Sequence, residues 1–225
     1  MNTYENIIAI PFRNRDNHLD YFIKNTVPLL QEYLPNSKVV VIEQNEGKLF
    51  NRGALLNIAF KEYENKTKYF FTHDVDIIPT QEIIETIYTN ENIDVYRIKS
   101  AHDTSLGGII KVKHNIMFHI NGFPNNMWGW GIEDRALFFR CHVKNISITN
   151  NKKNSFKILP HKSNVMKYTG EKKKISDMWR FDYINTLDDK QKEEMIMSSG
   201  LNNLEYTILE RKNIHDIVEI IKVDI

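Results

Sequence analysis

The chain has 225 residues, of which 41% are hydrophobic and 26% charged, so it is not a disordered polymer and holds one large or two small globular domains. Its 30 Lys and Arg nearly balance its 29 Asp and Glu, and a net charge of +1 supplies no field for sequence-independent binding of nucleic acid. Because Cys141 is the one cysteine and no apolar run reaches the roughly 18 residues of a membrane span, we expect a soluble protein without disulfides, in a reducing, cytoplasmic compartment.

Three short apolar runs alternate with helical patterns in the first third of the chain. The runs at residues 6–12, 38–44 and 68–72 have the continuous hydrophobicity of buried strands. Between them, apolar residues recur at intervals of three and four over residues 19–30, and a second helical run at residues 55–60 follows a capping Asn51. This alternation predicts a parallel sheet, in which ligands bind beyond the carboxyl ends of the strands.

The rest of the chain gives shorter patterns. We expect a helix at residues 81–88, strands at 93–98 and 107–112, a loop at 121–131 and a helix at 133–143. The last 25 residues predict two strands that turn around Lys212 and Asn213. No internal repeat, low-complexity linker or change of composition marks a boundary, so we expect residues 1–225 to form a single domain.

The sequence His73-Asp74-Val75-Asp76 closes the third predicted strand. Alternation along a strand would place Asp74 and Asp76 on one side, where two carboxylates repel unless a cation lies near them. Such oxygen ligands suit Mg²⁺ or Mn²⁺, which can in turn hold a nucleotide diphosphate. The alternative is that Asp74 caps the next turn and Asp76 is solvated, and the pattern alone does not decide between the two.

Residues 128–134 read Trp-Gly-Trp-Gly-Ile-Glu-Asp. Two indoles separated by glycines combine flat surfaces for stacking on a sugar ring with a backbone that can hinge over a substrate. Glu133 or Asp134 could act as a general base toward an acceptor hydroxyl. The alternative, which composition alone favours, is that both carboxylates only stabilise a helix N-terminus. His161 is a candidate metal ligand, although a lone histidine is more often structural.

Taken in order, these motifs resemble one family, the metal-dependent β-1,4-galactosyltransferases with their N-acetylgalactosaminyl and xylose-directed relatives. The matching stretches cover nearly the whole chain and are PFRNR at residues 11–15, VIEQ at 41–44, FNRGALLN at 50–57, HDVD at 73–76, GG at 107–108, the loop at 121–131, RFD at 180–182, GLNNL at 200–204 and VDI at 223–225. The resemblance implies an α/β nucleotide-diphospho-sugar transferase fold of the GT-A type, with an open, mostly parallel mixed sheet flanked by helices.

The resemblance also implies roles for individual residues. By position, Asp134 matches the general base and Glu133 lies beside it in the donor-sugar pocket, while Asp76 and His161 match ligands of a Mn²⁺ cofactor. The positions that match the binding site of the UDP-sugar are Pro11, Phe12, Arg13, Arg15, Phe50, Arg52, Asp74, Val75, Asp76, Gly108 and Trp130. The positions that match the pocket for the acceptor's N-acetyl group are Arg180, Phe181 and Ile184.

The implied reaction is an inverting glycosyl transfer. With one base and no evident covalent nucleophile, a single in-line displacement would move Gal or GalNAc from a UDP-sugar to a hydroxyl of a GlcNAc-like or other sugar acceptor, forming a β-1,4 linkage. Mn²⁺ would neutralise the negative charge that appears on the departing UDP. The tryptophan loop would exclude the water that otherwise hydrolyses the donor.

Three positions depart from the family pattern. Ile158 stands where the family has a methionine metal ligand, and Arg135 replaces an aspartate that helps seat the acceptor. Ser105 replaces a bulky tyrosine of galactosyl-specific members, which leaves room for the 2-acetamido group of UDP-GalNAc. The first two departures motivate an alternative, a UDP-sugar or glycan binding module that has lost catalysis. A metal-dependent phosphoryl transferase is poorly supported, because no Gly-rich phosphate loop accompanies the paired aspartates.

Overall fold

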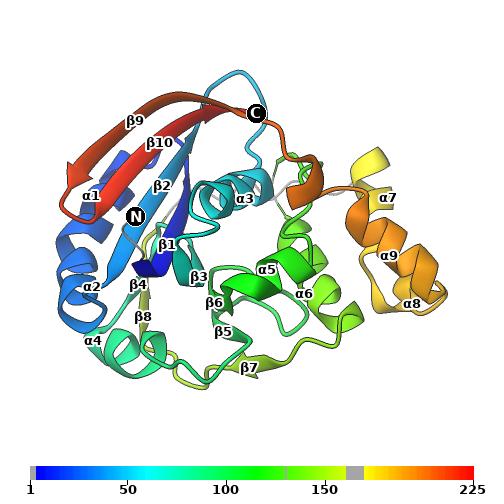
Figure 1. Cartoon of the computed structure of the whole chain (residues 1–225), viewed down its shortest axis with the longest axis horizontal. Coiled ribbons are helices and arrows are strands. Elements are labelled where there is room, and N and C mark those ends of the chain that lie inside the picture. The colour runs from blue at the N-terminus through cyan, green and yellow to red at the C-terminus, as the bar shows by residue number, and fades with distance from the viewer. Residues whose placement is uncertain (1–3, 130, 161–169) are drawn as a thin grey trace.

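The computed structural model describes residues 4–129, 131–160 and 170–225 and arranges them around one mixed sheet with helices on both faces (Figure 1). The described strands form an eight-stranded sheet in the order β7-β5-β6-β3-β1-β2-β10-β9 and a two-stranded sheet, β4-β8. The strands are β1 (Tyr4–Phe12), β2 (Ser37–Gln44), β3 (Thr67–His73), β4 (Ile77–Pro79), β5 (Val95–Lys99), β6 (Ile109–Lys113), β7 (Ile148–Asn150), β8 (Phe156–Ile158), β9 (Thr207–His215) and β10 (Val218–Asp224).

Parallel pairing dominates the centre of the large sheet. Strand β1 pairs in parallel with β2 and β3, β10 pairs in parallel with β2, and β5 pairs in parallel with β7. Strand β6 runs antiparallel to β3 and β5, and the edge strand β9 runs antiparallel to β10. The expectation of an open, mostly parallel mixed sheet flanked by helices is therefore confirmed.

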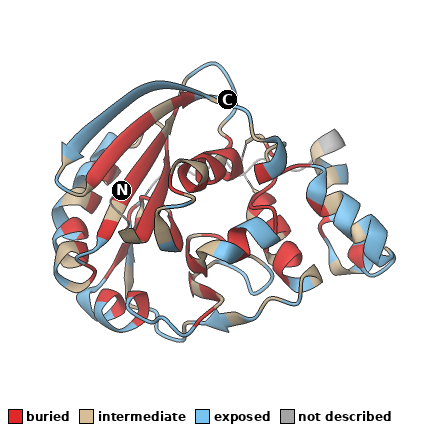
Figure 2. Cartoon of the chain, viewed as in Figure 1, coloured by how far each residue is buried: buried red, intermediate tan, exposed pale blue. Residues whose placement is uncertain are grey.

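Helices cover both faces of this sheet. They are α1 (Asp16–Asn25), α2 (Val27–Tyr33), α3 (Arg52–Glu62), α4 (Gln81–Ile83), the π-helical turn η1 (Ile84–Tyr88), α5 (His114–His119), α6 (Glu133–Val143), α7 (Gly170–Met178), α8 (Phe181–Ile184), α9 (Asp189–Met197) and the 3₁₀ turn η2 (Leu201–Asn203). On β1, Ile8 and Ile10 pack with α1 and α2, while Ile7 and Ala9 pack with α3. Side chains of a strand alternate between its faces, so each central strand contributes to two cores. Figure 2 shows the resulting burial of the central strands and the exposure of β9 and α9.

Several predicted elements differ in their ends. The helical pattern at residues 19–30 divides at Thr26 into α1 and α2, since Pro28 lacks an N–H and its ring would clash with the carbonyl of a continuous helix. The helix predicted at 81–88 is α4 followed by η1. Strand β6 begins at Ile109, because Gly108 has a φ of 67° and interrupts the extended chain.

The prediction that the C-terminal strands turn around Lys212 and Asn213 is wrong. Strand β9 continues to His215, and the two-residue turn lies at residues 216–217. Polar residues 210–213 resemble a turn, but they lie on an exposed edge strand, where charged side chains are common because they discourage pairing with another chain.

A buried arginine of α6 binds the start of the predicted loop at residues 121–131. The described residues of the loop 121–131 form no helix or strand, as expected. Arg140 of α6 is fully buried and donates hydrogen bonds of 2.8 Å to the carbonyls of Asn121 and Gly122, and another to the carbonyl of Ser199. Burial lowers the pKa of Arg140 to about 9, so the side chain keeps its charge at neutral pH.

Replacement of this arginine tests its role. Arg140→Met leaves the buried carbonyls of Gly122 and Ser199 without a donor, whereas the carbonyl of Asn121 keeps the N–H of Leu201. The substitution is expected to lower the free energy of unfolding by about 2 kcal/mol, at about 1 kcal/mol or more for each unsatisfied group. Lys190→Met, on the exposed face of α9, is the control and should change it by less than about 0.5 kcal/mol. Urea unfolding measures both. Equal stabilities would show that the carbonyls find other partners.

Candidate active site

The site lies where the order of the strands reverses. From β1 the chain passes to β2 on one side and later to β3 on the other, which makes the carboxyl end of β1 a switch point where ligands bind in open α/β sheets. The ladder between β1 and β3 ends at the pair Ala9 and Thr72, whereas the ladder between β1 and β2 continues to Phe12 and Glu43. Pro11 therefore lies beyond the β1–β3 ladder, where its missing N–H costs no bond to β3.

The chain that leaves β1 meets the chain that leaves β2. Arg13 donates a hydrogen bond of 2.8 Å to the carbonyl of Lys48, and its guanidinium carbon lies 5.4 Å from the centre of the Phe50 ring. Two residues that the sequence assigns to the UDP-sugar, 37 positions apart, are thus neighbours.

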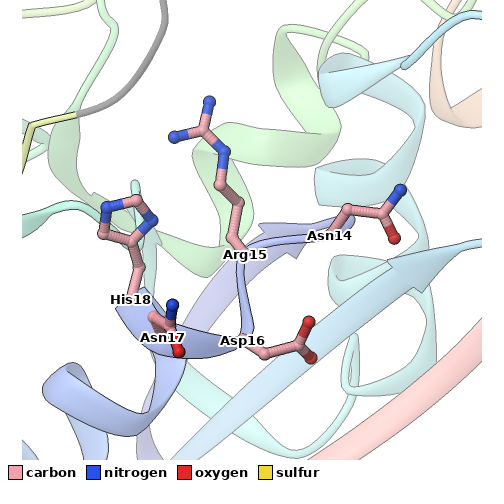
Figure 3. Close-up of a pocket in the computed structure, with 5 residues that line it drawn as sticks. All are labelled: Asn14, Arg15, Asp16, Asn17 and His18. Carbon is pink, nitrogen blue, oxygen red and sulfur yellow. The ribbon is translucent and has the colours of Figure 1, made fainter.

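Arg15, also assigned to the UDP-sugar, borders an open cavity next to this point. Residues Asn14 to His18 line the cavity, whose volume is about 240 Å³. Figure 3 shows the side chains of Arg15 and His18 extending to the same side of the loop. The structure thus gathers Arg13, Arg15 and Phe50 at the carboxyl end of the central strands.

Arg52 is the central residue of the site. It is the first residue of α3, which begins there because the Asn51 side chain accepts the N–H of Ala54 at 3.0 Å. Arg52 Nη2 lies 2.8 Å from Asp74 Oδ1 and Arg52 Nη1 lies 2.5 Å from Asp134 Oδ1. Glu133 Oε1 is 3.9 Å from the same Nη1. The side chain of Arg52 is only 11% exposed, so one buried guanidinium joins the turn after β3 to the start of α6.

The charges of this group shift one another's ionisation. Burial opposes the charge of Arg52, but the three carboxylates outweigh it and raise the pKa of the guanidinium. Burial, with the charge of Asp134, raises the pKa of Glu133 to about 8, and burial also raises the pKa of Asp134. Since Asp134 contacts Arg52 more closely than Glu133 does, Asp134 carries the negative charge at neutral pH and Glu133 holds the proton.

The carboxylates of Glu133 and Asp134 lie in the first turn of α6 and also contact Arg52. Ile132 precedes the helix, and no side chain caps it. Because both carboxylates also contact Arg52, the alternative that they serve only a helix N-terminus is disfavoured. Ile132 has a φ of 85°, a conformation that costs a β-branched residue about 1–3 kcal/mol, so the entry to α6 is strained beside the site.

The glycine pair touches both aspartates that Arg52 joins. A Cβ on Gly107 would lie 2.1 Å from Asp134 Oδ2, so only glycine leaves room for that carboxylate. The carbonyl of Gly108 accepts the N–H of Asp74 at 3.1 Å. The sequence singled out Gly108 for its resemblance to a donor-site glycine, but the contact of Gly107 with Asp134, 27 residues away, left no local signal.

The acidic turn after β3 is tighter than expected. Strand β3 ends at His73, and the N–H of Ile77 donates to the carbonyl of Asp74 at 3.1 Å, which closes a four-residue turn. The argument that strand alternation aligns Asp74 with Asp76 is therefore wrong, since Asp76 is no longer part of the strand. Val75 is 7% exposed and packs in the core.

A second segment borders this turn. Strand β8 pairs with β4, and the N–H of Leu159 donates to the carbonyl of Asp76 at 2.8 Å. Ile158, at the position where a methionine ligand was expected, is 52% exposed. The predicted ligand His161 and the predicted lid residue Trp130 lie outside the described residues.

The acidic turn has suitable chemistry for a hard divalent cation. Asp74 and Asp76 supply carboxylate oxygens from one short turn, the ligand type that Mg²⁺ and Mn²⁺ prefer. Within residues 4–129, 131–160 and 170–225, no group of three or more His, Cys, Asp or Glu side chains is arranged to hold a metal ion. A complete ligand set would therefore need a further group beyond those residues, and His161 is the predicted one.

The residues predicted to bind the acceptor lie on and beside α8. Arg180 is exposed and forms an ion pair of 3.2 Å with Asp182. Phe181 packs against Phe139, with ring centres 4.5 Å apart. Ile184 is 1% exposed and belongs to the core beneath α8, so its side chain is closed to solvent.

The departures from the family pattern also have defined places. Arg135 donates toward the Ser176 hydroxyl at 3.3 Å, which connects α6 to α7. Ser105 shares a hydrogen bond of 2.8 Å with Ser100 and lies two residues before Gly107, the glycine that contacts Asp134.

Comparison with known proteins identifies the family. The family described as "N-terminal region of glycosyl transferase group 7" matches residues 2–89, and "N-terminal domain of galactosyltransferase" matches residues 89–162. The chain belongs to glycosyl transferase group 7. The resemblance to β-1,4-galactosyltransferases inferred from the sequence is thereby confirmed.

Individual relatives agree with this family. The chain is 31% identical to β-1,4-galactosyltransferase 1 of Bos taurus over 211 residues, which are 90% of this chain and 50% of the relative. It is 34% identical to β-1,4-galactosyltransferase 4 of Homo sapiens over 152 residues, 63% of this chain and 44% of the relative. The chain thus spans about half the length of these relatives.

Solved structures share the fold. The catalytic domain of Drosophila β-1,4-galactosyltransferase 7, in complex with xylobiose, superposes with a TM-score of 0.80 at 21% identity and covers 99% of this chain and 94% of its own. A mutant of the same enzyme, crystallised with manganese, UDP-Gal and xylobiose, superposes with a TM-score of 0.79 at 23% identity, with the same coverage. The predicted fold class is confirmed. In the part of this chain that the structure describes, every helix is too short or too polar to cross a bilayer.

The buried pair predicts how stability depends on pH. Folding raises the pKa of Glu133 to about 8, so between about pH 5 and 8 the folded protein holds a proton that the unfolded chain releases. The free energy of unfolding should therefore fall as pH rises, by up to about 1.4 kcal/mol per pH unit. Glu133→Gln should flatten this slope in urea unfolding at four pH values. Glu205→Gln, on the surface, should leave it unchanged, and a parental slope in Glu133→Gln would contradict the burial of an ionisable group.

Proposed function

We propose that the chain is an inverting, metal-dependent hexosyltransferase that moves Gal or GalNAc from a UDP-sugar to a hydroxyl of a GlcNAc-like or other sugar acceptor, forming a β-1,4 linkage. The observation that carries this proposal is the contact of Arg52 with both Asp74 and Asp134, which brings the donor side and the base side of the reaction together. Membership of glycosyl transferase group 7 supports it.

The donor would bind at the switch point of the sheet. Arg13, Arg15 and Arg52 provide cations for a diphosphate, and the ring of Phe50 lies beside Arg13, where a uracil can stack. Pro11, Phe12, Val75 and Gly108 form the backbone around this position, and Trp130 would cover the bound donor.

A divalent cation, Mn²⁺ by resemblance, would be held by Asp76 and His161, with Asp74 beside them. When bound, it would neutralise the negative charge that develops on UDP as the glycosidic bond breaks. The Drosophila relative crystallised with manganese and UDP-Gal supports this choice of cofactor and donor.

Asp134 would act as the general base. Its carboxylate accepts the proton of the acceptor hydroxyl while that oxygen bonds to the anomeric carbon and the bond from this carbon to UDP breaks. Because the oxygen enters opposite the leaving group, an α-linked donor gives a β-linked product. Glu133, which keeps its proton at neutral pH, can donate a hydrogen bond to the donor sugar. Arg180, Phe181 and Ile184 would border the acceptor.

We also propose that residues 1–225 form one catalytic domain, because β10, at the C-terminal end of the chain, completes the sheet that β1 begins. For location, we propose a soluble protein in the cytoplasm. The support is that Cys141, the one cysteine of the chain, is buried and unpaired, as expected in a reducing compartment.

Release of UDP tests the activity. The protein should release UDP from UDP-Gal or UDP-GalNAc when a GlcNAc-terminated or xylose-terminated acceptor is present, and chelation of Mn²⁺ should abolish the release. Preference for UDP-GalNAc would agree with the small side chain of Ser105. UDP affinity without turnover of any donor would contradict the proposal and favour the binding module, which Ile158 and Arg135 motivated.

Two substitutions separate the base from the metal site. Asp134→Asn should lower kcat by about 10²–10⁴-fold, the usual contribution of a general base, and keep the affinity for UDP. Asp76→Ala should lose the Mn²⁺-dependent part of UDP binding in calorimetry. An Asp134→Asn variant as active as the parent would refute the assignment of the base.

A further inference from the structure

A chain of buried hydrogen bonds lies directly beneath the acidic turn. His73 is 0% exposed, and its Nδ1 lies 3.0 Å from the carbonyl oxygen of Asp74. Its Nε2 lies 2.9 Å from the hydroxyl of Tyr88. Since a carbonyl only accepts, Nδ1 carries the hydrogen and Nε2 accepts from Tyr88. Burial lowers the pKa of His73 to about 4, which agrees with a neutral ring.

The end of this hydrogen-bond series that lies away from the turn is fixed to the sheet. Tyr88 ends η1 and is 0% exposed, and its carbonyl accepts a hydrogen bond of 2.7 Å from Lys111 of β6. Lys111 also donates to the carbonyl of Asn90 at 2.8 Å, and its ammonium lies 4.1 Å from the centre of the Tyr69 ring. Hydrogen bonds thus connect strand β6 to the carbonyl of Asp74 through Lys111, Tyr88 and His73.

The receiving carbonyl controls the geometry of the turn. It belongs to the peptide between Asp74 and Val75, and it also accepts the N–H of Ile77 that closes the turn. If the bond from His73 is lost, this peptide keeps one partner where it had two and can tilt more easily. Asp74, which precedes this peptide, and Asp76, which follows Val75, would then move relative to each other.

We propose that Tyr88 and His73 are positioning residues for the acidic turn and so set its affinity for the divalent cation. This inference rests on the proposed function. Neither side chain touches substrate or metal in this role, because Tyr88 acts through His73 and His73 acts through the backbone of Asp74.

The surroundings argue against a role in core packing alone. The ring of Phe22 lies 5.1 Å from His73, and the ring of Phe71 lies 5.1 Å from Tyr88, centre to centre. Burying polar groups among such rings costs free energy unless every group is bonded, and apolar side chains would fill the same space without that requirement. The two polar side chains are bonded to each other and then to the turn.

The test compares two tyrosines whose hydroxyls make equivalent bonds. Tyr88→Phe removes the hydroxyl that holds His73. Tyr69→Phe is the matched control, since Tyr69 is 2% exposed, lies on β3 and donates a hydrogen bond of 2.7 Å to the carbonyl of Glu91, away from the turn. Mn²⁺ binding is measured by electron paramagnetic resonance of free Mn²⁺ in the presence of UDP, with Asp76→Ala as the baseline for other sites.

Tyr88→Phe should raise the dissociation constant for Mn²⁺ roughly three- to tenfold, the effect of one hydrogen bond, while Tyr69→Phe leaves it unchanged. Thermal unfolding should show similar losses of stability in both. His73→Phe should weaken Mn²⁺ binding further, and His73→Asn, which keeps an N–H donor near the position of Nδ1, should restore part of it. This rescue is not expected if His73 only fills space.

Three results would overturn the inference, namely unchanged Mn²⁺ binding in Tyr88→Phe, equal weakening in both tyrosine variants, or a parent protein that binds no Mn²⁺ above the Asp76→Ala baseline. The proposed function fails separately. If the parent binds Mn²⁺ but turns over no donor, and Tyr88→Phe still binds the ion more weakly, the positioning role stands without the transferase.

Discussion

The site depends on one buried guanidinium placed between carboxylates from two distant parts of the chain. Arg52 contacts Asp74, which follows β3, and Asp134, in the first turn of α6. Its position is fixed by close packing of α3, because a Cβ on the next residue, Gly53, would lie 2.7 Å from the carbonyl oxygen of Pro124. The start of α3 and the loop 121–129 therefore approach as closely as backbone allows, and Arg52 cannot retreat from the two aspartates.

The fold supports this contact with buried polar side chains that bind backbone. Asn57 of α3 is 0% exposed, donates to the carbonyl of Phe123 at 2.7 Å and accepts the N–H of the same residue at 2.8 Å. Arg140 binds the carbonyls of Asn121 and Gly122 at the start of that loop, and His73 binds the turn after β3. Each buried donor or acceptor would cost free energy if left unpaired, so each loop conformation is specified strongly.

Local patterns in the sequence predicted the helices and strands, but only some of the contacts between them. The buried strands and the start of α3 after Asn51 follow from hydrophobic runs and capping, which act within a few residues. The resemblance supplied the site residues by position. The contact of Arg52 with Asp134 spans 82 positions and that of Gly107 with Asp134 spans 27, and no periodicity records such pairs. The tight turn after β3 was missed for the same reason, since Asp74 bonds to the carbonyl of Gly108, which is distant in the sequence.

The charge of the cluster connects the two ligands that the proposed reaction needs. Arg52 carries one positive charge and contacts two aspartates, so the contacts leave an excess of negative charge even while Glu133 stays protonated. A diphosphate approaching Arg52 would be repelled by this excess. A divalent cation at the acidic turn would offset it, in a partly buried site where screening by water is weak. Because coupling between two binding sites is reciprocal, each ligand would then strengthen the binding of the other beside Arg52.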